Sequence, residues 1–345
     1  MRVGRCFIVV TICVGMVLSF GNKDRSEAAE LEGKIIAIVT HPVASLGYTM
    51  GNALANTITK HSPMRVDVEP TAGPKSWLPR MQRGEVQFGL ASDIDVFAGL
   101  IGDKEFYKAP YSGIRVVKQA HHALRLTILV RNNSSIKSMK DLVGKKVAAL
   151  TPGQPSLERT SRAAIYSGGV DLDKIKWTVA GNLTGAGRAI KEGRADAACI
   201  PIGNSVVEEL EAAWGARFLS ADISAEGLHR ARKYLPTASG LLIKPGPTGV
   251  REPTGFLAFQ YNLVAWEDLS ADMVKAVLKA LDENFDEYKG AHPLMKTWDP
   301  KTSISALIGA PIHPAAIEYY QNKGLWTAGV AERHQELLKL IGETR

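Results

Sequence analysis

Cysteine is scarce in this sequence, with three residues in a chain of 345. Two of them, Cys6 and Cys13, belong to an apolar stretch near the N-terminus, so the rest of the chain holds Cys199 alone. No disulfide can form within that remainder, and its stability must come from a packed hydrophobic core. Cys199 itself lies in the apolar run ADAACIPI, which is typical of a buried and inert thiol.

Long hydrophobic runs are also rare, and the one that occurs spans the fifteen residues 6–20. A membrane-spanning helix needs roughly 20 apolar residues, so this run is short for that role. Arg2 and Arg5 precede it, and residues 26–28 supply the small side chains that a signal peptidase reads. We therefore predict a secretory signal peptide over residues 1–28 and export to the periplasm, with an uncleaved N-terminal anchor as the alternative.

Dense charge of one sign and the usual catalytic motifs are missing as well. The formal net charge of +7 comes from scattered basic residues without interleaved aromatic residues, which argues against a nucleic-acid partner. The eight histidines show no zinc-binding spacing, and neither a Gly-x-Ser-x-Gly elbow nor a complete dinucleotide fingerprint occurs. We therefore expect no metal, no cofactor and no catalysis, whereas an anionic small molecule is a compatible ligand.

What the sequence does contain is an order of strands and helices that occurs twice. The first occurrence predicts a strand at 34–40, a loop at 41–47, a helix at 48–59, a strand at 65–69, a short helix and a strand at 86–90. The second predicts a strand at 145–150, a loop at 151–155, a helix at 156–167, a strand at 176–179, a further helix and a strand at 195–200. Gly84 and Gly193 stand where a left-handed residue would end the second helix of each set.

The C-terminal third has a looser pattern. Prolines and glycines mark residues 236–255 as loop, and a strand is expected at 256–265. Ser270 is a helix cap before apolar residues at helical spacing, and His313 opens a last amphipathic segment with Pro314 in its first turn. The whole pattern predicts an α/β chain with two similar lobes: residues 29–125 plus 246–345 form lobe 1, and residues 126–245 form lobe 2.

A ligand cleft is expected between the lobes, because open parallel sheets bind ligands beyond the carboxyl ends of their strands. The loops at those ends supply the candidate ligand-binding residues, which are Ser45, Leu46, Tyr48, Trp77, Ser92 and Asp93 from lobe 1 and Thr151, Gln154, Ser156 and Gly203 from lobe 2. Five of them have a structural alternative: Ser92, Asp93 and Ser156 are also good helix caps, and aromatic residues such as Tyr48 and Trp77 are mostly core.

Several stretches together resemble one family, the TAXI class of periplasmic solute receptors for tripartite ATP-independent (TRAP) transporters. The resemblance spans about Ile36 to Trp326, and its order and spacing are specific. The stretches that carry it are GYTMGNALANTITKH, VEPTAGPKSWLPRMQRGEVQFGLASDIDVFAG, SIKSMKDLVGKKVAALTPGQPS, KEGRADAACIPIGNSVVEEL and HPAAIEYYQNKGLW.

The resemblance implies a two-lobed, type II periplasmic-binding-protein fold with parallel-rich sheets flanked by helices. It also implies capture of a small organic anion and its delivery to TRAP membrane permease subunits. The chain departs from the family pattern at three loops, 44–48, 73–77 and 152–156, where bare glycine amides or a polar asparagine give way to larger side chains. We therefore expect a carboxylate ligand that is bulkier or less polar than glutamate.

Three other functions compete with this interpretation. An exported receptor could pass its ligand signal to a kinase instead of a permease. An enzyme could use the same bilobal fold, although the sequence shows no clustered catalytic set. A receptor of the tripartite tricarboxylate system is the nearest alternative, and the ending HPAAIEYYQNKG argues against it.

Overall fold

The protein is described here by a computed structural model that covers residues 30–43, 45–150, 155–181 and 183–342. Its strands form one sheet in the order β2-β1-β3-β10-β4-β7-β5-β6, with β8 beside β4 and β9 beside β10. The strands are β1 (Ile35–Thr40), β2 (Arg65–Pro70), β3 (Phe88–Ser92), β4 (Ile114–Arg131), β5 (Lys146–Leu150), β6 (Lys176–Val179), β7 (Ala197–Pro201), β8 (Ala216–Phe218), β9 (Ser239–Ile243) and β10 (Thr254–Trp266).

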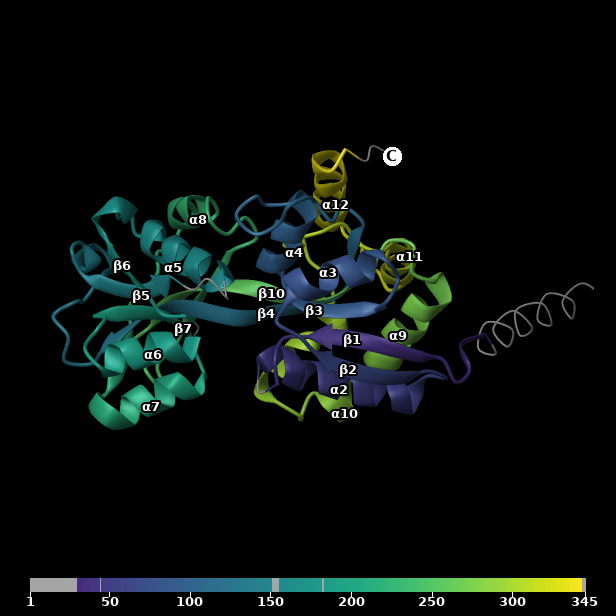
Figure 1. The fold of residues 1–345 in the computed structure, drawn as a ribbon, viewed down its shortest axis with the longest axis horizontal. Coiled ribbons are helices and arrows are strands. Elements are labelled where there is room, and N and C mark those ends of the chain that lie inside the picture. Colours follow the sequence, from purple (N-terminus) through teal and green to yellow (C-terminus); the bar gives the residue numbers. More distant parts are fainter. Residues whose placement is uncertain (1–29, 44, 151–154, 182, 343–345) are drawn as a thin grey trace, which may run out of the picture.

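Helices cover both faces of this sheet (Figure 1). The α-helices are α2 (Leu46–His61), α3 (Pro74–Gln82), α4 (Asp93–Ile101), α5 (Pro155–Ser167), α6 (Leu183–Lys191), α7 (Ser205–Trp214), α8 (Ala225–Ala231), α9 (Ala271–Glu283), α10 (Phe285–Tyr288), α11 (Pro314–Asn322) and α12 (Ala328–Leu340). Short 3-10 turns are η1 (Met139–Leu142), η2 (Leu172–Lys174), η3 (Pro293–Trp298) and η4 (Pro300–Thr302). None of the helices in the described ranges is long and apolar enough to span a membrane.

The sheet is parallel toward its two ends and antiparallel in its middle. β1 pairs in parallel with β2 and β3, and β5 pairs in parallel with β6 and β7. Between these sets, β10 is antiparallel to β3 and β4, and β4 is antiparallel to β7. The predicted α/β class is therefore confirmed, and the long strands β4 and β10 join its two parallel parts into one continuous sheet.

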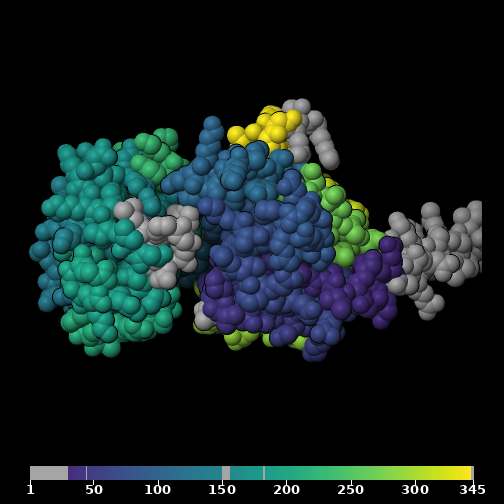
Figure 2. Space-filling model, viewed as in Figure 1, coloured from purple at the N-terminus to yellow at the C-terminus, as the bar shows by residue number. Residues whose placement is uncertain are grey.

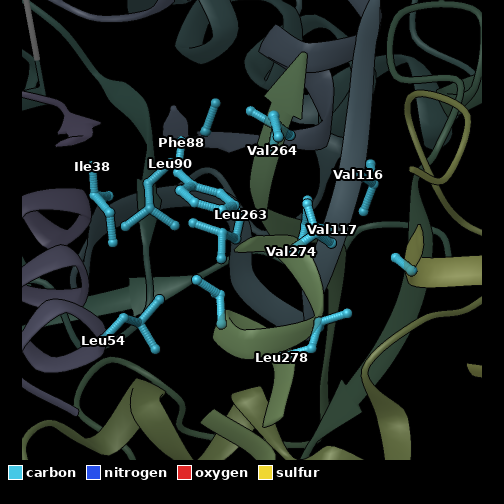
Figure 3. Close-up of a cluster of buried hydrophobic side chains, with 14 of the residues drawn as sticks. Ile38, Leu54, Phe88, Leu90, Val116, Val117, Leu263, Val264, Val274 and Leu278 are labelled. Atoms are coloured by element: carbon cyan, nitrogen blue, oxygen red, sulfur yellow. The ribbon is translucent and has the colours of Figure 1, made fainter. Parts of the chain in front are cut away.

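The hydrophobic core is divided in the same way. One cluster, which we call the core of the first half, draws on residues 31–123 and 261–337. Two further clusters, the core of the second half, draw on residues 126–259 together with Ile94. Figure 3 shows Leu54, Phe88 and Leu263 among the side chains of the first core. Each such buried side chain stabilises the fold by about 1.5–3 kcal/mol.

The two halves meet at a narrower waist (Figure 2), which β4 and β10 cross (Figure 1). The boundary expected at residue 125 falls inside β4, and the boundary at residue 245 falls between β9 and β10. The division into lobes at these residues stays a prediction.

Some elements agree with the sequence prediction, others begin at different residues, and β9 was not predicted. β6 has the expected bounds, and Gly84 and Gly193 are left-handed at φ 73° and 71°. Helix α2 begins two residues earlier than expected, since Ser45 caps it, whereas β3 begins two residues later. The expectation of loop throughout 236–255 is wrong, because β9 pairs there with β10.

Candidate functional site

Polar side chains of the first half gather where β1 and β3 end. His41 follows β1, and Ser92 closes β3 and caps α4. The Ser92 hydroxyl accepts a hydrogen bond from the backbone N–H of Asp95 at 3.2 Å and donates one to Asp95 Oδ2 at 2.8 Å. Because parallel strands end at the same edge of the sheet, these loops meet, as the sequence pattern predicts.

Tyr261 of β10, a strand that connects the two halves, adds a further polar side chain to this group. The Tyr261 hydroxyl, on β10, lies 2.9 Å from His41 Nδ1, and the rings have centroids 6.2 Å apart. Gly47, in the first turn of α2, makes this contact possible, since a Cβ there would collide with the Tyr261 hydroxyl and lie 3.2 Å from His41 Nδ1. We call His41, Ser92, Asp95 and Tyr261 the first wall.

Burial shifts the pKa values of the ionisable side chains in the first wall. Burial lowers the pKa of His41, while the nearby Asp95 carboxylate raises it. The pKa of Asp95 is raised by burial, against the opposing effects of His41, of the Ser92 hydrogen bond and of the Arg159 charge. Burial also raises the pKa of Tyr261, with a further contribution from Asp95. The wall therefore combines buried groups that can donate and accept hydrogen bonds.

The second half contributes the first turn of α5, which is the positively polarised end of a helix dipole. Arg159, just past this turn, pairs with Asp103 and Glu105 of the first half, and its positive charge lowers the pKa of Asp95. A pocket of about 410 Å³ lies beside these contacts, lined from the first half by Phe97, Ile101, Asp103 and Glu105 and from the second by Glu158, Arg159, Arg162, Lys233, Tyr234 and Pro236.

A second polar group lies on the connecting strands themselves. His121 and His122 of β4 stack with ring centroids 3.8 Å apart, and the His122 backbone N–H donates to Gln260 Oε1 at 2.6 Å. His122 has φ 52°, a left-handed conformation that is strained for histidine. Three buried nitrogens, His121 Nδ1, His122 Nε2 and Gln260 Nε2, have no partner among the described residues. Buried polar atoms of this kind need water or a ligand.

Asp93 is also buried at this junction. Both carboxyl oxygens lack a hydrogen-bond partner within the described part of the chain. Burial raises the pKa of Asp93 to about 8, although Thr237 of the second half and the backbone of Gln260 act in the opposite direction. The side chain is thus largely neutral at neutral pH and does not repel an anion strongly.

Several residues that were predicted to bind the ligand cap a helix or pack against the core. Ser45 caps α2, its hydroxyl accepting from the Tyr48 N–H at 3.1 Å, and Leu46 packs against the core of the first half. Tyr48 is half-buried in the first turn of α2, beside the first wall. Ser156 lies inside the first turn of α5, so it is not the cap residue that the structural alternative proposed.

Other predicted residues lie apart from the first wall. Trp77 is fully buried, because α3 turns it inward onto β3, where a Cβ at Gly89 would lie 2.7 Å from its ring. The structure thus places this ring in the core instead of at a cleft surface. Gly203 is exposed in the turn after β7, with φ 76°. Thr151 and Gln154 lie outside the described residues.

Sequence reasoning missed His41, Tyr261 and the pair on β4. His41 directly follows a predicted strand, and that position was the available signal. Tyr261 sits inside an apolar strand run, where nothing distinguishes it from a core residue.

Cys199 is a free and buried cysteine. Burial raises the pKa of Cys199 to about 12, which keeps the thiol protonated. Within the described ranges, no three or more His, Cys, Asp and Glu side chains are grouped to hold a metal ion. The first wall can hydrogen-bond and orient a small polar molecule, which is the chemistry of binding.

Comparisons with known proteins agree with this fold. The chain is similar to the periplasmic sulfonate-binding protein SsuA of a putative sulfonate ABC transporter from Methylobacillus flagellatus KT, at 17% identity and a TM-score of 0.50, over 90% of this chain and 96% of that one. It is also similar to a TctC solute binding protein from Polaromonas, at 13% identity and a TM-score of 0.51, over 90% and 99% of the two chains. No curated protein matches the sequence.

The fold is therefore that of the periplasmic solute-binding proteins. Residues 38–324 match the NMT1-like family, which is most of the chain. On that match, the protein belongs to the NMT1-like family.

Proposed function

We propose that this protein is an exported solute receptor of the TAXI class, which binds a small organic carboxylate between its two halves and delivers it to a TRAP-type membrane permease. One observation carries the proposal: the first wall lies at the carboxyl ends of β1 and β3, and Arg159 of the other half pairs with Asp103, which follows the helix that Ser92 caps. A site made by both halves binds its ligand more tightly when they close.

The charges of the site favour an anion. The first turn of α5 offers the positive end of a helix dipole to an anion, while the Arg159 guanidinium that follows it is held by Asp103 and Glu105. Burial raises the pKa of Asp93 to about 8, so this carboxyl is largely neutral at neutral pH and repels an anion less than an ionised carboxylate would.

The expected lobes explain how such a receptor would move. Lobe 1 comprises residues 29–125 and 246–345, lobe 2 comprises residues 126–245, and β4 and β10 connect them. Bending of two strands at His122 and Gln260 would open the cleft while each core stays intact. The signal peptide at residues 1–28 would bring the receptor to the periplasm, where the permease takes the ligand.

A thermal-shift screen tests the ligand class. The protein recovered from the periplasm of an expressing bacterium is heated with carboxylates, amino acids, aromatic acids and aliphatic sulfonates. A carboxylate at 100 times its dissociation constant should add about 2.7 kcal/mol of apparent stability. A response confined to sulfonates would contradict the carboxylate assignment, and nanomolar glutamate binding would contradict a preference for a bulkier or less polar carboxylate.

A transport assay tests the partner. Vesicles that hold a TRAP-type permease and an ion gradient should accumulate the carboxylate found in the screen when the receptor is added. Uptake that needs ATP, or that requires no receptor, would contradict delivery to such a permease.

A further inference from the structure

One ion-pair cluster joins the two halves directly. Arg159, on α5 of the second half, contacts Asp103 of the first half and lies 3.2 Å from Glu105 Oε2. Its guanidinium carbon lies 4.4 Å from the ring centroid of Phe106, also of the first half. The Arg159 and Asp103 side chains are 18% and 19% exposed, so this pair is shielded from solvent more than an ordinary surface pair.

The segment that carries these partners is held in place by its own backbone. Gly102 ends α4 in a left-handed conformation at φ 61°, and a Cβ there would collide with the backbone of residues 109–110. The Asp103 N–H donates to Ala98 O at 2.9 Å, and the Phe106 N–H donates to Asp103 O at 2.8 Å. Asp103, Glu105 and Phe106 are therefore presented to α5 in a fixed geometry.

The next arginine of the same helix makes different contacts. Arg162 pairs with Glu158 of α5 at 2.7 Å and lies 5.0 Å from the ring centroid of Trp177, so both partners belong to the second half. Removing Arg162 takes away one charge and one cation-π contact from the same helix face without removing a bond between the halves. It is the matched control for Arg159.

We propose that Arg159 is a positioning residue that latches the two halves together, so that the ligand-free protein already populates a closed arrangement in which Arg159 contacts Asp103 and Glu105. The inference rests on the proposed function only in assuming that the halves move. A latch of this kind lowers the cost of closure that a ligand must overcome, because part of the closing free energy comes from protein contacts.

The latch borders the pocket of about 410 Å³, which solvent can enter, and Glu105 is 59% exposed. Dissolved salt can therefore screen the pair. Two predictions follow for the closed population: it falls when Arg159 is removed, and it also falls in the unchanged protein when the salt concentration rises.

The test measures the distance between the halves without any ligand. Spin labels are attached at Asn56→Cys on α2 and at Glu209→Cys on α7, and pulsed electron paramagnetic resonance measures the distance between them. Cys199 is buried and stays unlabelled. Arg159→Ala should lower the short-distance population by about fivefold. Arg159→Lys should have a smaller effect, since lysine keeps the charge but loses the planar stacking and the forked hydrogen bonds. Arg162→Ala should leave the distribution unchanged.

Salt provides a test that needs no variant at position 159. Raising sodium chloride from about 0.05 to 1 M should shift the doubly labelled protein toward long distances. The latch is refuted if Arg159→Ala and Arg162→Ala give the same distance distribution, or if the distance distribution does not change with the salt concentration. The outcome is separate from the proposed function, because the latch can fail while a carboxylate still binds, and the screen can fail while the latch holds.

Discussion

The hydroxyl of Tyr261 lies 2.9 Å from Nδ1 of His41, a contact between residues 220 positions apart in sequence. It ties the loop after β1 to a strand that crosses between the halves, so the first wall is fixed relative to the connection. On the proposed function, a ligand held by this wall would therefore act directly on the strands about which the halves would move.

Removing this hydroxyl should weaken both the fold and ligand binding. Tyr261→Phe keeps the ring and deletes one buried hydrogen bond, which should lower the free energy of unfolding by about 1 kcal/mol in urea denaturation. Tyr288→Phe is the control, since Tyr288 donates to Trp298 O at 3.3 Å within the core of the first half. Both variants should lose stability, whereas the thermal shift with the bound carboxylate should shrink in Tyr261→Phe alone. Equal ligand responses would show that the hydroxyl has no part in the site.

Gly47→Ala should destabilise the protein although alanine favours helices. Alanine normally gains up to about 1 kcal/mol over glycine inside a helix, but here its Cβ would collide with the Tyr261 hydroxyl. Overpacking of this kind costs about 1–3 kcal/mol, so the clash should prevail. Gly290→Ala, where no atom lies within 4 Å of the added Cβ, should be nearly neutral. A stabilised Gly47→Ala variant in chemical denaturation would contradict the close approach.

Asp93 should make the protein less stable as pH rises. Its pKa is about 8 in the folded protein, mainly because of burial, against an ordinary value of 3.8. Between these values the unfolded chain releases a proton that the folded protein keeps, so the free energy of unfolding falls by up to about 1.4 kcal/mol per pH unit. The loss should begin near pH 4 and level off above pH 8.

The difference between wild type and Asp93→Asn isolates this effect, because other titrating groups cancel. In urea unfolding between pH 4 and 9, the stability of Asp93→Asn relative to wild type should rise with pH. A constant difference across that range would mean that Asp93 is not buried as described.

Glycine should be tolerated better at His122 than at His121. His122 has φ 52°, a conformation that strains other residues by roughly 1–2 kcal/mol and costs glycine nothing. Both side chains are half-buried and stack on one another, so their losses of packing are comparable. His122→Gly should therefore be about 1 kcal/mol more stable than His121→Gly in urea unfolding. The reverse order would argue against a strained bend in β4.

Local sequence patterns predicted the elements that repeat in each half, because apolar spacing and helix caps depend on residues that are close together in the sequence. Ser45, Ser92 and Gly193 acted as caps or stops, as their residue types suggest. β4 was not predicted, since His121 and His122 interrupt its apolar run and the strand crosses from one core to the other.

The candidate site was only partly predictable. Its loops follow from the parallel strands, but Tyr261 reaches His41 through antiparallel pairing of β10, which no local pattern reveals. Trp77 misled the prediction, because its ring lies on the buried face of α3 and packs against Gly89 of β3. Which face of a short helix is buried depends on tertiary packing, which a local pattern does not reveal.

The most direct measurement of the central claim is calorimetric titration of the unlabelled protein with the carboxylates that score in the thermal-shift screen. The account predicts saturable binding of one molecule per chain, with Tyr261→Phe weakening it by about three- to tenfold, as loss of one hydrogen bond would. Absence of heat for every carboxylate, or conversion of an added compound into a product, would contradict a receptor that binds without chemistry.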